Sequence, residues 1–153
     1  MLTVQKTVIV AGISALLVVA GAAQEHAVKM ASLPGPVQAT VKEQIAQGAT
    51  VRNLVTDREN GKLEYEAELT VNGKHRDLTM DASGKVLEAE DAVAIAEVPA
   101  PARAAFDKAG KTVSVEAVSQ DGKLVAYEAV VRKSNGKRTE VRVTPEGKPA
   151  PEN

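Results

Sequence analysis

The chain has 153 residues and a formal net charge of −1 at pH 7. Three aromatic side chains and no cysteine occur in it. This composition argues against nucleic-acid binding, which needs basic patches and stacking rings, and it excludes disulfides, thiol catalysis and thiolate metal sites.

The first 23 residues have the three parts of a secretory signal peptide. Lys6 supplies the positive charge, residues 8–23 form an uncharged apolar run, and small residues close that run before Gln24. We expect cleavage after Ala22 or Ala23 and a periplasmic or secreted mature protein. A retained membrane anchor is the less favoured alternative, because the run is shorter than the roughly 20 residues that span a bilayer.

Residues 24–32 are predicted to form a flexible N-terminal segment, and the body after them contains an internal repeat. Tyr65-Glu66-Ala67 recurs as Tyr127-Glu128-Ala129. Six Gly-Lys turns recur with nearly constant offsets, at Gly61, Gly73 and Gly84 and then at Gly122, Gly136 and Gly147. The repeat predicts one copy over residues 33–92, a second over 93–149, and a tail at 150–153.

Each copy begins with a predicted helix. Paired prolines lie at or before its first turn, where proline is tolerated, and a glycine follows it, as is usual at a helix end. Apolar residues recur on one face between these signals. In the first copy they are Val37, Val41 and Ile45, and in the second Ala102, Ala105, Phe106 and Ala109.

Strands are predicted after each helix, with hairpins at the Gly-Lys turns. Apolar residues at every second position from Leu63 to Val71 alternate with Glu64, Glu66 and Glu68, the pattern of a half-buried strand. Pro145 and Pro149 predict that the last strand of the second copy is short or missing. We therefore predict an α+β fold of two tandem repeats, each with one helix packed on a three- to four-stranded antiparallel β-meander.

In the order of their predicted helices and strands and in their motifs, residues 30–150 resemble the PepSY-like family. This family is similar to the bacterial β-lactamase-inhibitor proteins. The segments that carry the resemblance are 65–74, 78–88, 127–131 and 141–148. The resemblance implies an exported protein without enzyme activity that binds, and in some relatives inhibits, a hydrolase such as a peptidase. The aromatic binding face and the disulfides of the β-lactamase inhibitors are absent here, so their specific target does not carry over.

Catalytic, cofactor-binding and metal-binding residues are not expected, and no cofactor is predicted. The two histidines are His26, near the predicted start of the mature chain, and His75, which is expected on an exposed strand face with Asp77 and Thr79. Neither accompanies a nucleophile motif or a usual zinc spacing.

Charge suggests where a partner would bind. Residues 24–92 hold 12 acidic and 8 basic side chains, whereas residues 93–153 hold 8 acidic and 10 basic ones. The predicted partner-binding surface consists of Glu64, Glu66, Glu68, Arg138, Glu140 and Arg142.

The function predicted from these observations is that of a non-catalytic exported binding protein, an inhibitor or regulator of an envelope or secreted hydrolase. Its expected partner is another envelope or secreted protein, and membrane contact is expected only through the signal peptide before cleavage. The alternative is a small-ligand carrier in the periplasm, with the ligand held between helix and sheet or between the repeats.

Overall fold

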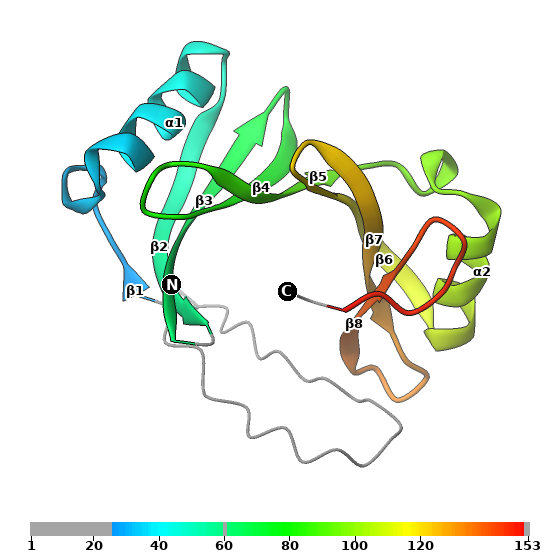
Figure 1. Ribbon diagram of the computed structural model, residues 1–153. Helices are drawn as coiled ribbons and strands as arrows, with labels where there is room; N and C mark the ends of the chain where they lie inside the picture. Colours follow the sequence, from blue (N-terminus) through cyan, green and yellow to red (C-terminus); the bar gives the residue numbers. More distant parts are fainter. Residues whose placement is uncertain (1–25, 60, 152–153) are drawn as a thin grey trace. The chain divides into compact units, whose positions relative to one another are not determined.

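A computed structural model describes residues 26–59 and 61–151, which form mostly antiparallel sheet with two α-helices (Figure 1). The predicted signal peptide lies outside the described residues. Within the described residues, no helix is long and apolar enough to cross a membrane.

The elements follow one another with short connections. The helices are α1 (Gly35–Ala46) and α2 (Ala100–Ala109), each preceded by a single 3-10 turn at Met30–Ser32 and Ile95–Glu97. The strands are β1 (His26–Ala27), β2 (Thr50–Glu59), β3 (Lys62–Val71), β4 (Lys74–Met80), β5 (Val86–Ala92), β6 (Lys111–Gln120), β7 (Lys123–Arg132) and β8 (Arg138–Val143).

The strand order corrects the predicted fold class. The eight strands form a single antiparallel sheet in the order β1 to β8, so that every strand lies beside its neighbour in the sequence. The prediction of two tandem repeats, each a helix on its own meander, was therefore wrong. An open sheet edge exposes a row of unpaired N–H and C=O groups. Placing β5 beside β6 removes two such edges, which separate meanders would have kept.

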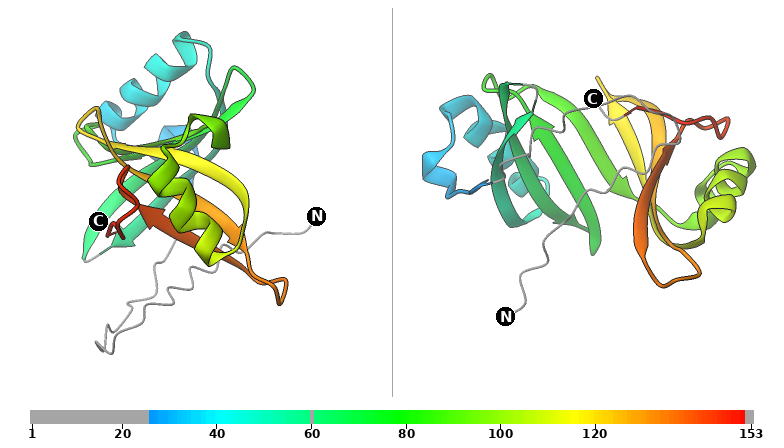
Figure 2. Two further views of the ribbon diagram at one scale, coloured as in Figure 1. Left: turned by 90° about the vertical axis from the view of Figure 1, so that its right-hand side faces the viewer. Right: turned by 90° about the horizontal axis from the view of Figure 1, so that it is seen from below.

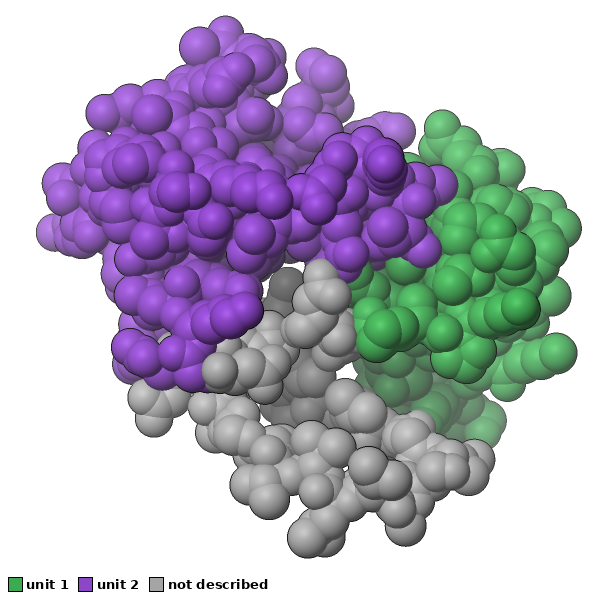
Figure 3. Space-filling model, in the orientation of Figure 1, with its two compact units in different colours: residues 1–17, 93–116, 126–153 green, residues 18–92, 117–125 purple. Residues whose placement is uncertain are grey.

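Two compact units are distinguished within the described chain (Figure 3). Unit 1 includes residues 93–116 and 126–153, and unit 2 includes residues 18–92 and 117–125, as far as these are described. Unit 2 thus includes residues 117–125, the hairpin that joins β6 to β7.

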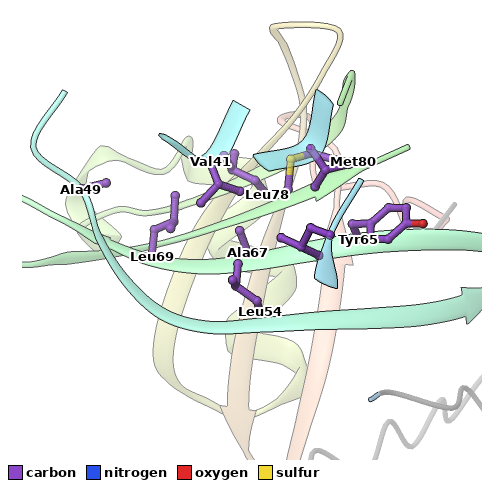
Figure 4. Close-up of a cluster of buried hydrophobic side chains, with 10 residues drawn as sticks. Val41, Ala49, Leu54, Tyr65, Ala67, Leu69, Leu78 and Met80 are labelled. Atoms are coloured by element: carbon purple, nitrogen blue, oxygen red, sulfur yellow. The ribbon is translucent and has the colours of Figure 1, made fainter. Parts of the chain in front are cut away.

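The core of unit 2 lies between α1 and one face of its strands (Figure 4). Val37 and Val41 of α1 are fully buried, together with Leu69 of β3 and Met80 of β4. Not every predicted core residue is buried. Ile45 in the last turn of α1 and Leu63 at the hairpin end of β3 are each 43% exposed.

The core of unit 1 is built on α2, which lies beside β8 (Figure 2). Ala102 and Phe106 are the fully buried side chains of α2, whereas Ala105 and Ala109 are half-buried. Tyr127, Ala129 and Val131 of β7 are buried by the same alternation that buries Tyr65, Ala67 and Leu69 of β3. As Pro145 and Pro149 predicted, no further full-length strand follows β8 in the described residues. The chain instead returns in one isolated bridge between Val143 and Pro149.

A turn glycine packs against each helix start. Gly84 has a φ of 79°, and a Cβ there would collide with the backbone carbonyl of Pro36 in α1. Gly147 has a φ of 77°, and a Cβ would collide with the carbonyl of Pro101 in α2. Both turns therefore need glycine for conformation and for space.

Candidate functional site

The face of unit 2 that points away from α1 carries carboxylates. Alternation along β3 buries Tyr65, Ala67 and Leu69 against α1, so Glu64, Glu66 and Glu68 must lie on the opposite face. All three glutamates are half-buried, not fully solvated. Half-burial follows from their place in the middle of the strand order, with β2 on one side and β4 on the other.

Strand register brings further carboxylates to this face. Glu64 lies opposite Asp57 of β2, and Glu68 lies opposite Asp77 of β4. Asp77 is in turn opposite Glu90 of β5. We define the acidic face as Asp57, Glu64, Glu66, Glu68, Asp77, Glu88 and Glu90.

Three polar side chains bind carboxylates of the acidic face. The Asn53 side-chain amide donates to Glu68 Oε1 at 3.3 Å, and the Gln120 amide donates to Glu88 Oε2 at 2.8 Å. His75 Nε2 lies 2.8 Å from Asp77 Oδ2. The expectation that His75 and Asp77 share a strand face is confirmed, although His75 is half-buried at 33% exposure.

Like charges directly opposite each other are the unusual property of this face. The pairs Asp57–Glu64, Glu68–Asp77 and Asp77–Glu90 are all in register, and such pairs destabilise a sheet. The helix-facing side of the same strands shows the opposite arrangement. There Arg76 lies opposite Asp91, with its Nε 2.5 Å from Asp91 Oδ1.

An exposed ion pair borders the acidic face at two hairpin turns of unit 2. Lys85 Nζ in the turn between β4 and β5 lies 2.8 Å from Asp121 Oδ1 in the turn between β6 and β7. The hydrogen bond from Lys85 lowers the pKa of Asp121, and Asp121 raises the pKa of Lys85.

The second half of the predicted binding surface lies in unit 1, on β8. Arg138 and Glu140 are exposed. Arg142 is not, because its side chain is 6% exposed and its Nη1 lies 3.7 Å from Glu128 Oε2 on β7. The predicted residues thus fall into three groups: the half-buried glutamates of unit 2, two exposed residues in the first half of β8, and one buried arginine.

Sequence reasoning missed four members of the acidic face, namely Asp57, Asp77, Glu88 and Glu90. The place of Asp77 on the face opposite Leu78 and Met80 was visible from alternation, but the register that sets Asp77 between Glu68 and Glu90 was not. In the described residues, no group of three or more histidine, aspartate or glutamate side chains has the geometry of a metal site.

Comparison with known proteins adds likeness of fold. No family model and no curated protein matches the chain. A candidate periplasmic protein from Bacteroides eggerthii has a solved structure that matches with a TM-score of 0.59 and 19% identity, over 78% of this chain and 86% of that one. A DUF2874 family protein from Bacteroides uniformis matches with a TM-score of 0.58 and 19% identity, over 77% and 86% of the two chains. Another DUF2874 family protein, from Bacteroides ovatus, matches with a TM-score of 0.56 and 17% identity, over 78% of this chain and 86% of that one.

Proposed function

We propose that the chain is an exported, non-catalytic binding protein whose acidic face engages a partner with a basic surface. The observation that carries this proposal is the set of like-charged neighbours on this face, the pair Asp57–Glu64 on β2 and β3 and the row Glu68–Asp77–Glu90 on β3 to β5. Such neighbours lower the stability of the free protein. A partner that brings lysine or arginine side chains to this face would relieve the repulsion. The stability lost to that repulsion in the free protein would then be recovered on binding.

The charge balance of the face supports a cationic partner. Against seven carboxylates, the register-paired positions of this face in the described residues carry Lys62 and His75 as basic side chains. A surface of one sign attracts an oppositely charged partner over a distance of about one Debye length, roughly 8–10 Å in physiological salt. The association is therefore expected to be fast and to weaken as salt is added.

Export and regulation of a hydrolase are the finer parts of this proposal. The N-terminal charge and hydropathy pattern supports export with cleavage after Ala22 or Ala23, and the likeness of fold to a candidate periplasmic protein supports a periplasmic location. The hydrolase as partner rests on the resemblance to the PepSY-like and β-lactamase-inhibitor proteins.

A small-ligand carrier is less well supported. The space between α1 and the sheet, one of the two places considered for a ligand, is filled with packed side chains. Val37, Val41, Leu69 and Met80 are all fully buried there, so a ligand would have to displace core residues.

The test is a cross-linking pull-down from an envelope fraction, with the tagged chain produced by export through its own N-terminal segment. The intact mass of the purified protein reports the cleavage site. We expect a basic protein, a hydrolase on the finer proposal, to be enriched. A lysine-rich peptide serves as a defined probe in calorimetry, with an affinity that falls as salt rises.

The variant E64Q/E66Q/E68Q should lose both the captured protein and the peptide. Its matched control is E43Q/D107N/E146Q, which changes the net charge equally at exposed positions that are not part of the acidic face. Equal losses of capture and peptide binding in the two variants would show that net charge alone explains the effect. That result would refute the proposed surface. Capture that survives the first variant would refute it as well.

A further inference from the structure

Among the described residues, no strand lies beside the outer edge of β8 over most of its length. β8 is the last strand in the order, and β7 pairs with its inner edge. In the described residues, the outer edge meets only the returning chain, where the Ala150 N–H donates to the carbonyl of Arg142 at 3.1 Å and Val143 bridges Pro149. The edge from residue 138 to residue 141 extends beyond that contact.

The backbone direction along this edge follows from that hydrogen bond. The carbonyl of Arg142 points away from β7, and backbone groups of an antiparallel strand alternate in direction from one residue to the next. The N–H and C=O groups of Glu140 and Arg138 therefore also point outward. Both side chains are exposed, and they lie on the same face of the strand because they are two residues apart.

We propose that this edge pairs with the same edge of a second copy of the chain, antiparallel and centred on Thr139. In that register Arg138 of each copy lies opposite Glu140 of the other, and the two residues exchange N–H···O bonds. Each arginine then has a carboxylate as its cross-strand neighbour. Thr139 meets Thr139 of the second copy, and threonine pairs of this kind favour strand pairing.

Charge complementarity selects a second copy as the occupant. Edge strands avoid pairing with copies of themselves when their charges are alike. Here the charges alternate in sign, so an offset antiparallel copy presents opposite charges, and a two-fold axis repeats the contact. A register centred on Glu140 would instead set two carboxylates against each other. The interface is small, so the association is expected to be weak, and it lies in unit 1, independent of the acidic face.

Sedimentation equilibrium on the exported chain tests this inference, at concentrations up to about 1 mM, where weak dimers are populated. We expect a monomer–dimer equilibrium. R138E and E140R should each weaken the dimer about tenfold, because each change creates two like-charged cross-strand pairs. An equimolar mixture of the two variants should recover association as a heterodimer, and so should the double variant R138E/E140R, since both restore opposite charges.

The matched control is K133E, an exposed charge reversal in the neighbouring turn and outside the proposed register. It should leave the dimer unchanged, and far-UV circular dichroism checks that every variant is folded. A wild-type chain that stays monomeric over the whole concentration range would overturn the inference. A dimer that is insensitive to the charge reversals, or a mixture that fails to recover association, would overturn it too.

Discussion

β3 and β7 carry the same Tyr-Glu-Ala sequence and bury the same face, but their opposite faces differ. On the buried face, Tyr65, Ala67 and Leu69 correspond to Tyr127, Ala129 and Val131. On the other face, Glu66 lies opposite Thr79, whereas Glu128 lies opposite Arg142. The tyrosine-bearing face is alike in the two strands, whereas the opposite face differs in its neighbours.

The consequence is electrostatic. In unit 1 the arginine on β8 neutralises the glutamate on β7 within the sheet face, at 3.7 Å. In unit 2 the strand next to β3 contributes Asp77 opposite Glu68, so the carboxylates accumulate. The two units thus differ in which charges their strand register sets side by side, opposite charges in unit 1 and like charges in unit 2.

The largest expected effect concerns the helix side chains buried in the core of each unit. Phe106 of α2 and Val41 of α1 are both fully buried. Phe106→Ala should lower the free energy of unfolding by about 4 kcal/mol, because it leaves a large cavity, and Val41→Ala should lower it by about 2 kcal/mol. Urea denaturation followed by circular dichroism measures both. Equal losses of unfolding free energy in the two variants would contradict the expectation that the larger buried side chain contributes more.

The next effect concerns the charged faces. Arg142→Ala should cost about 3 kcal/mol, because it removes a buried arginine and its ion pair with the half-buried Glu128. Thr79→Arg makes the reverse change in unit 2, since it sets an arginine opposite Glu66. It should stabilise the protein by about 0.5 kcal/mol and weaken binding of the lysine-rich peptide. A destabilised Thr79→Arg protein would contradict the view that carboxylate repulsion strains this face.

The smallest effect concerns the exposed pair Lys85–Asp121. Its contribution is complete between the ordinary pKa values of aspartate and lysine. It is lost at low pH as Asp121 protonates through its lowered pKa, and at high pH as Lys85 deprotonates through its raised pKa.

Lys85→Met should raise the pKa of Asp121 toward its usual value, as measured by an NMR titration of the carboxyl carbon. Lys123→Met is the matched control, because Lys123 lowers the same pKa less than Lys85 does. A larger rise in the Lys123 variant would refute the assigned contact.

Local patterns predicted most of the elements of this chain. Alternation along residues 63–71 identified β3 and its two faces, and the prolines at or just before the first turns of α1 and α2 marked where each helix starts. Pro145 and Pro149 accounted for the missing last strand. These features depend on neighbouring residues and on the conformational preferences of proline. They could be predicted because no distant contact is needed to decide them.

Contacts between distant residues decided the rest. The single sheet depends on β5 meeting β6, the acidic face depends on the register that places Asp77 between Glu68 and Glu90, and the burial of Arg142 depends on Glu128 across the strand pair. The sequence by itself therefore determined which side of β3 is apolar. Only the tertiary structure decided which polar side chains became neighbours, because strand register and edge pairing join residues that no local pattern relates.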